Sequence, residues 1–229
     1  MKPRRPLHAP IAVLLALASV LCAFPAQAAG HLGLYGVQMT PYGRDAGRYS
    51  EAGFGGGIQA VAPLPRPANL LAGVAGLEVI NLLSETTEFR DRLTGLRIEQ
   101  QTNQHYGRFY LGARLGLHGH EFFRPYAGAN LSLNFYGIST DVVVPDDSDR
   151  EKEIRQSLRS ENRMAFGYDG TLGVDLDIAT RFNLDGGVRY VKTFNVPQQL
   201  GEGSVPINPE YFQVFLGFGV SFDVMGAKH

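Results

Sequence analysis

"YFQVFLGFGVSF", residues 211–222, alternates between two kinds of side chain. The large apolar set comprises Phe212, Val214, Leu216, Phe218, Val220 and Phe222. The other set is mostly small or polar: Tyr211, Gln213, Phe215, Gly217, Gly219 and Ser221. A period of two residues is typical of a β-strand with two different faces. A soluble barrel would bury the apolar face, whereas a membrane barrel would turn it towards lipid.

Seven further segments have strand-like patterns, which brings the predicted number of strands to eight. The predicted strands are 31–40, 53–62, 70–82, 105–117, 125–138, 164–178, 182–194 and 210–222. No other stretch after residue 28 has a convincing helical period, although the polar segment 149–160 could form one short helix inside a loop.

The size of the side chains decides which face points inward. An eight-stranded barrel has an interior just wide enough for side chains, and rows of Phe, Leu and Val from five strands would crowd it. The opposite rows of Gly, Asn and Ser fit that interior. We therefore expect the apolar face to point outward into lipid, with Leu111, Leu131 and Val214 as examples.

The connectors between the predicted strands alternate in length. The long ones are 41–52, 83–104, 139–163 and 195–209, and the short ones are 63–69, 118–124 and 179–181. Bacterial outer-membrane barrels have this asymmetry, with short periplasmic turns and longer outer loops. The pattern predicts a closed, antiparallel, eight-stranded up-and-down barrel with both termini in the periplasm.

The N-terminal segment predicts export. Lys2, Arg4 and Arg5 precede an apolar run from residue 11 to 24, and "PAQAA" follows it. This combination is typical of a cleaved secretory signal peptide, here residues 1–28, which leaves 29–229 as one barrel domain. The only cysteine, Cys22, lies in the signal segment, so the mature chain is expected to have neither a disulfide nor a thiolate site. Removing three basic residues moves the formal charge from −1 to −4, which gives no indication of nucleic-acid binding.

The mature chain resembles the small eight-stranded outer-membrane barrels, the OmpA- and OmpX-like transmembrane domains. The resemblance rests on architecture and covers nearly the whole mature chain. It implies a transmembrane β-barrel in the cell outer membrane, with membrane lipid as its surroundings. It also implies that the last strand, with Phe212, Phe218 and Phe222 on one face, is the segment that the barrel-assembly machinery recognises.

Charged residues on the inward faces are the candidate site. They are Glu78, Arg108, Arg114, Asp169, Asp175, Asp185 and Arg189. Glu78, Arg108, Asp169 and Arg189 are expected in the outer half of the barrel, and the other three nearer the periplasmic end. Opposite charges in a narrow interior should pair, because an unpaired buried charge is costly. Such pairs would plug the lumen, and the alternative interpretation is a gated path for ions.

Other motifs do not indicate catalysis or a cofactor. His105 is the only histidine expected near the outer rim, and no Ser-His-acid pattern of a lipid hydrolase surrounds it. "HGHE" (118–121) offers too few ligands on a short turn to predict a metal site. "DDSDREKE" (146–153) lacks the glycine spacing of a calcium loop, and "GFGGG" (53–57) lacks the Lys-Ser/Thr of a phosphate loop. We predict no catalytic residue, metal or cofactor, and expect the glycines of 53–57 to relieve crowding in the lumen.

These observations favour a non-enzymatic outer-membrane protein with a structural role, or with outer loops that recognise a partner the sequence does not identify. Three other functions are possible from the sequence. They are a narrow pore for small solutes, a lipid-modifying hydrolase, and a soluble barrel that binds an apolar ligand.

Overall fold

The fold is known from a computed structural model of the chain. It describes residues 30–49, 51–64, 70–90, 97–116, 122–144, 154–179, 181–200 and 203–222. The predicted signal peptide (1–28) and the segments 118–121 and 146–153 lie outside these residues.

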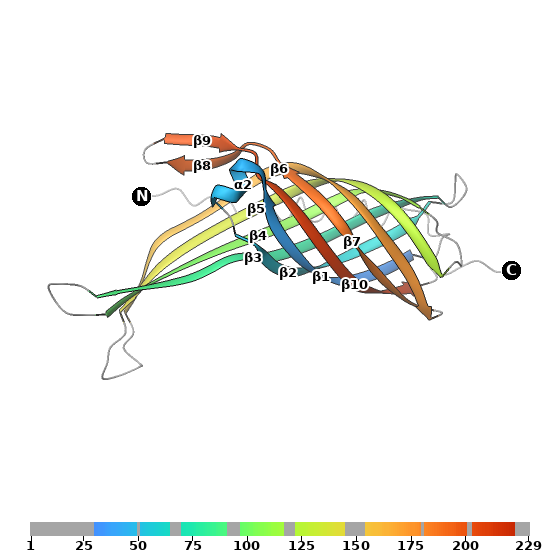
Figure 1. Ribbon diagram of the computed structural model, residues 1–229, viewed down its shortest axis with the longest axis horizontal. Coiled ribbons are helices and arrows are strands. Elements are labelled where there is room, and N and C mark those ends of the chain that lie inside the picture. The colour runs from blue at the N-terminus through green and yellow to red at the C-terminus, as the bar shows by residue number, and fades with distance from the viewer. Residues whose placement is uncertain are drawn as a thin grey trace, which may run out of the picture.

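Eight strands form a closed barrel (Figure 1). They are β1 (Gly30–Tyr42), β2 (Gly53–Pro63), β3 (Leu71–Arg90), β4 (Arg97–Gly116), β5 (Phe123–Val144), β6 (Ile154–Ala179), β7 (Phe182–Thr193) and β10 (Glu210–Phe222). Each strand pairs antiparallel with its neighbours in the chain order, and β1 closes the barrel by pairing with β10 from Gly30↔Phe222 to Tyr42↔Glu210. Closure pairs the backbone groups of every strand inside the bilayer, as hydrocarbon requires. The predicted fold class is confirmed.

Two small elements lie at the end of the barrel opposite Gly30. Helix α2 (Gly43–Tyr49) follows β1, and a hairpin of β8 (Val196–Leu200) and β9 (Gly203–Ile207) connects β7 to β10. The sequence did not predict either element, because each has only five to seven residues, too few to show a period. None of the helices in the described residues is long and apolar enough to cross a membrane.

The apolar side chains point outward, as the sequence predicted. Leu111 is 42% exposed, Leu131 75% and Val214 58%. Their strand neighbours Tyr110, Ser132 and Gln213 are buried inside the barrel. Such a wide apolar surface would cause aggregation in water, and it is stable only when lipid covers it.

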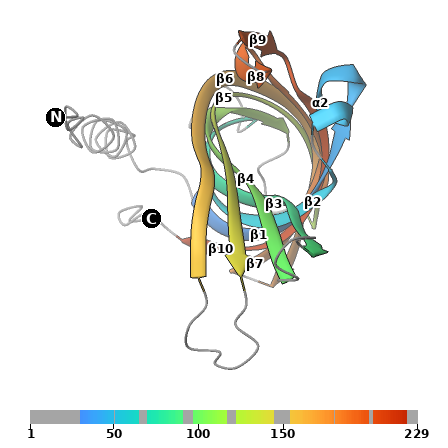
Figure 2. The same cartoon turned by 90° about the vertical axis from the view of Figure 1, so that its left-hand side faces the viewer.

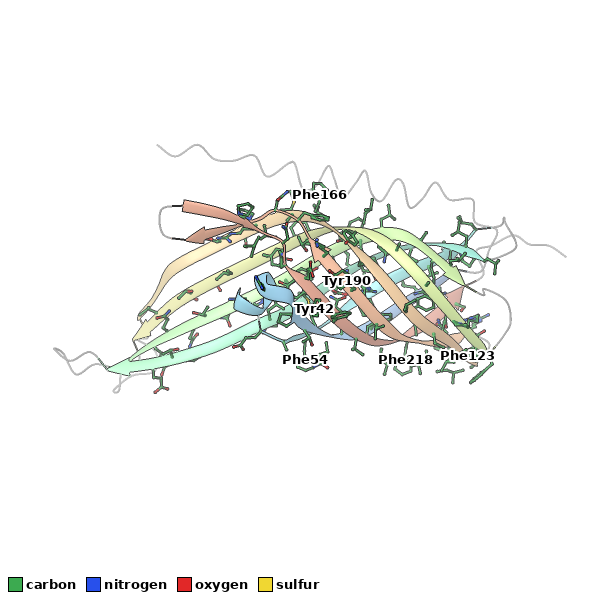
Figure 3. The ribbon with its side chains drawn as sticks, turned by 45° about the horizontal axis from the view of Figure 1, so that its top comes forward. Tyr42, Phe54, Phe123, Phe166, Tyr190 and Phe218 are labelled. Carbon is green, nitrogen blue, oxygen red and sulfur yellow. The ribbon has the colours of Figure 1, made fainter. Side chains whose placement is uncertain are left out.

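Aromatic rings are concentrated near the two ends of this apolar surface (Figure 3). At the α2 end, the ring of Phe212 lies 5.0 Å from that of Tyr42 and 5.5 Å from that of Tyr190. At the other end, Phe123 and Phe182 are exposed. Aromatic girdles of this kind mark the two membrane interfaces of outer-membrane barrels.

Four strands project beyond the barrel wall, and this corrects the predicted loops. Segments 83–104 and 139–163 were predicted as loops, but β3 to β6 continue through most of both (Figures 1 and 2). The short polar helix that 149–160 could have formed is not found in the described residues of this segment, because β6 begins at Ile154. The sequence of these extensions is mostly polar and has no apolar period, yet the strands still pair with one another: β3 with β4, β4 with β5, and β5 with β6.

The register shows where the apolar outer surface ends on these four strands. Asn81 pairs with His105, His105 with Gly137, and Gly137 with Asn162, so one continuous row of small or polar residues crosses the sheet. Beyond this row the sequence of the four strands is mostly polar, which indicates that this part of the sheet lies outside the apolar belt. A transmembrane strand needs only about 9–11 residues, whereas β6 has 26.

Candidate functional site in the barrel interior

Glu78 is the centre of the largest polar cluster in the interior. Its Oε2 atom lies 3.3 Å from Arg108 Nη2 and 3.0 Å from Arg189 Nη1, and it accepts a hydrogen bond of 3.0 Å from the Tyr35 hydroxyl. Its Oε1 atom accepts a hydrogen bond of 2.7 Å from the Gln213 amide. These five residues come from β3, β4, β7, β1 and β10, so the contacts join strands on opposite sides of the barrel.

Asp169 on β6 completes this cluster. Its Oδ2 atom accepts from Arg108 Nη1 at 3.0 Å, and its Oδ1 atom accepts from Asn130 at 2.7 Å. Arg189 Nε lies 3.6 Å from Asp169 Oδ1. Two carboxylates therefore balance two guanidinium groups, and all four side chains are almost completely buried.

Tyrosine and phenylalanine rings fill the space around the two arginines. The Arg108 guanidinium lies 4.6 Å from the Tyr110 ring centre, and that of Arg189 lies 4.8 Å from the Phe215 ring centre. Rings in this position attract a cation through their negative faces. The guanidinium groups thus have partners at their edges and on their faces.

A second ion pair lies nearer the Gly30 end of the barrel. Arg114 Nη2 is 3.0 Å from Asp185 Oδ2, and the other oxygen of Asp185 accepts from the Tyr126 hydroxyl at 2.6 Å. Gln59 donates to Asp185 Oδ2 at 2.5 Å and accepts at 3.5 Å from the Tyr110 hydroxyl. The Tyr110 and Tyr35 hydroxyls are 3.2 Å apart. Hydrogen bonds therefore connect the two clusters.

A third group lies closest to the short turns. Arg124 Nη2 is 3.2 Å from Asp175 Oδ1, and the Arg124 guanidinium donates two hydrogen bonds to Asp177, one from Nη1 and one from Nη2. Asn183 donates to Asp175 at 2.8 Å, and His31 Nε2 is 3.9 Å from Asp175 Oδ2. This group is more accessible than the central cluster, since Asp177 is partly exposed.

Apolar and aromatic side chains pack together in the interior on the α2 side of the central cluster. The buried residues there include Met39, Ile80, Leu82, Tyr106, Val191 and Tyr211. Tyr106 donates to Asn134 at 2.7 Å, and Tyr136 donates to Thr193 at 3.0 Å. The interior thus contains a packed apolar layer followed by a paired polar layer.

The seven residues predicted for the interior cluster all point inward and are buried. The structure brings Glu78, Arg108, Asp169 and Arg189 together and places Arg114 with Asp185. Asp175 belongs to a separate group with Arg124.

Sequence reasoning missed several partners in these clusters. Arg124 was assigned to a connector, but it lies in β5 directly opposite Asp175. The neutral partners Gln59 and Gln213 and the tyrosine hydroxyls were missed because uncharged residues give no pairing signal. The inward alternation of the strands could have identified them.

The other sequence motifs contribute no site in the described residues. His105 lies on the outward face of β4 and is exposed. In the described part of the chain, no three His, Cys, Asp or Glu side chains are placed to hold a metal ion. In "GFGGG", a Cβ atom at Gly57 would lie 2.5 Å from the Tyr35 ring, so the inward glycine leaves room for that ring.

The last strand has the predicted outward aromatic residues. Phe212 and Phe218 are exposed on β10, and the backbone of Phe222 pairs with Gly30. The side chain of Phe222 is outside the described part of the structure.

Solved structures with the same architecture provide the comparison. Neisserial surface protein A (NspA) superposes with a TM-score of 0.53 and 16% identity over 84% of this chain and 97% of that chain. A major outer membrane protein from Thermus thermophilus gives a TM-score of 0.49 and 10% identity over 84% of this chain and 99% of that chain. Ail of Yersinia pestis gives a TM-score of 0.42 and 11% identity over 87% of this chain and 100% of that chain. No protein-family model and no curated protein matches the sequence.

The similarity to NspA concerns the fold, because the identity is low. The chain has the fold of the small eight-stranded outer-membrane barrels, which confirms the resemblance drawn from its sequence. The apolar outer surface and its aromatic girdles agree with a position in the outer membrane.

Proposed function

We propose that the protein is a non-enzymatic outer-membrane barrel whose lumen is closed by ion pairs and whose projecting sheet recognises a partner outside the cell. Export by a signal peptide at residues 1–28 and assembly through the last strand belong to this proposal. The observation that carries it is the Glu78 cluster, because its hydrogen bonds cross the lumen and leave its charges balanced.

The closed lumen argues against a pore. Glu78 joins β3 to β4, β7, β1 and β10, and Arg108 extends the network to Asp169 on β6. An ion that crossed the barrel would have to separate these charge-assisted hydrogen bonds, which are among the stronger ones in proteins.

The projecting sheet supports the recognition role. In the described residues, β3 beyond Leu82 pairs only with β4, and β6 before Phe166 pairs only with β5. Within the described residues, the backbones of these two edge strands therefore pair with another strand on one side only. A free edge can bind an extended segment of another protein by adding a strand to the sheet.

Planar-bilayer recordings test the closed lumen. The wild-type protein should show no stable conductance, whereas Glu78→Ala combined with Arg108→Ala should allow ion flow. Leu131→Ala, which changes the lipid face, is the control and should remain silent. Stable conductance of the wild type would instead support the narrow pore.

Attachment of intact cells tests the recognition role. Cells whose barrel has short turns in place of residues 84–103 and 141–157 should lose binding to protein-coated surfaces. The protein should be present in equal amounts on both kinds of cell. Unchanged attachment would contradict a role for the sheet.

A further inference from the structure

A groove lies on the outer face of the barrel, across β10, β1, β2 and β3. Its cavity volume is about 630 Å³. Gly36 and Gly56 are direct cross-strand partners, and they form its floor. A Cβ atom at Gly36 would have no contact closer than 4.0 Å, so the missing side chain leaves open space on the outer surface.

Large apolar side chains surround this floor. Leu216 and Val79 stand on either side of the glycine pair in the same row of the sheet. The next row towards the Gly30 end consists of Phe218, Leu34, Ile58 and Leu77. All six side chains are exposed, and Figure 3 shows Phe218 on the outer face. The groove is therefore a local depression in a surface that hydrocarbon covers.

A polar residue adjoins the other end of the groove. Gln38 follows Gly36 on the same face of β1, and it is exposed between its partners Val214 and Phe54. Its carboxamide makes no hydrogen bond to the described part of the chain. Tyr42, which belongs to the aromatic girdle, is four residues further along β1, so Gln38 lies just inside the membrane boundary. An amide without a partner is costly in hydrocarbon.

We propose that the groove binds one acyl chain of an outer-leaflet lipid, and that the Gln38 amide donates a hydrogen bond to the carbonyl of the ester or amide linkage. The apolar groove fits a hydrocarbon chain, and the carbonyl at the head of that chain is the acceptor that Gln38 lacks. The depth of Gln38 near the membrane boundary fits the place where such linkages lie. This inference goes beyond the closed lumen and the projecting sheet. It rests on the proposed function in one respect, that the barrel lies in lipid with its α2 end facing outward.

A second copy of the chain fits the groove less well. A twofold dimer brings the same patch of both copies together. Two depressions at Gly36 and Gly56 would then face each other and leave the space unfilled. A flexible acyl chain can occupy it without this constraint.

Two variants and a matched control isolate the site. Gly36→Leu should fill the groove, because its Cβ atom would meet nothing closer than two backbone oxygens at 4.0 Å. Gly170→Leu is the control, since Gly170 is exposed on β6 and also has open space around its Cβ position. Gln38→Leu removes the amide and keeps the apolar wall.

The experiment is a native mass-spectrometry titration of the barrel, purified from outer membranes, with two phospholipids that share head group and chains. One lipid has ester linkages, and the other has ether linkages without carbonyls. The wild type and Gly170→Leu should bind one ester lipid about fivefold to tenfold more tightly than the ether lipid, as one hydrogen bond provides. Gly36→Leu should lose the bound lipid, and Gln38→Leu should bind both lipids equally.

Each contrary result is decisive. Equal lipid binding by Gly36→Leu and Gly170→Leu would overturn the site. Equal affinity of the wild type for both lipids would overturn the role of Gln38. A dimer that Gly36→Leu dissociates would show that a second copy occupies the groove. Heat-modifiable mobility on a gel verifies that every variant is folded. The planar-bilayer recordings test the closed lumen independently of this lipid site.

Discussion

Glu78 on β3 and Arg108 on β4 are direct cross-strand partners, and their side chains meet at 3.3 Å inside the barrel. Arg189 reaches the same carboxylate oxygen from β7 at 3.0 Å. The register of two neighbouring strands thus creates an ion pair, and a third strand adds a second cation across the lumen. The alternating sequence predicts such pairing because it places all three residues on inward faces.

Replacing Arg108 with Ala should destabilise the barrel. The change leaves Asp169 and Glu78 with fewer positive partners, and breaking one side of a buried pair typically costs about 3–5 kcal/mol. Urea unfolding in lipid vesicles measures the free energy of unfolding of each variant. Arg44→Ala is the control, because Arg44 is exposed on α2, and a surface change of this kind is expected to stay within about 0.5 kcal/mol. Equal stabilities of the two variants would mean that the interior pairs contribute nothing.

Replacing Gly112 with Ala should disturb the Asp169 end of the cluster. A Cβ atom there would lie 2.2 Å from the Ala129 carbonyl oxygen and 2.4 Å from Asn130 Oδ1, and Asn130 donates to Asp169. Overpacking of this kind typically costs about 1–3 kcal/mol. The unfolding free energy in vesicles is again the measure.

Gly170→Ala is the matched control for this experiment. Gly170 pairs with the same Ala129 but points outward, and nothing lies within 4 Å of its Cβ position. We expect its stability to change by no more than about 0.5 kcal/mol. If Gly170→Ala were as unstable as Gly112→Ala, space inside the lumen would not explain the glycine at position 112.

Shortening the β3–β4 hairpin should leave the barrel intact. A tight turn in place of residues 84–103 removes only backbone beyond the row of Asn81 and His105, where the apolar outer face ends. The shortened protein should keep its heat-modifiable mobility and the midpoint of its urea unfolding. Loss of the folded band would show that the projecting sheet stabilises the barrel.

The sequence was most informative where one face of a strand meets lipid. In 211–222 and 105–117, an apolar outer face and a small or polar inner face give a clear period of two, so strands and orientation were predicted correctly. In β6 before residue 162 the sequence is mostly polar, and the period of two disappears although the strand continues. Pairing between polar strands depends on their neighbours, and one strand alone does not reveal it.

The sequence identified which charged residues lie in the interior, but it did not show which of them pair with each other. Charges at inward positions identified Glu78, Arg108 and Arg189, because few other groups can neutralise them there. Which charge meets which depends on barrel closure, since Arg189 reaches Glu78 over 111 positions of sequence. The role of Gln213 also depends on closure, because a neutral amide on β10 gives no sign of its acceptor on β3.

The orientation of the strands is the central claim, and Leu131 and Ser132 test it most directly. Leu131 is 75% exposed on the outer face, whereas Ser132 is buried in the lumen. Because the only cysteine lies in the proposed signal peptide, residues 1–28, Leu131→Cys and Ser132→Cys each give a barrel without that segment one site for a spin label. Collision rates with oxygen, which dissolves in the bilayer, are measured for both labels in vesicles. We expect frequent oxygen collisions for the label at position 131 and few at 132; the reverse order would contradict an apolar face turned to lipid.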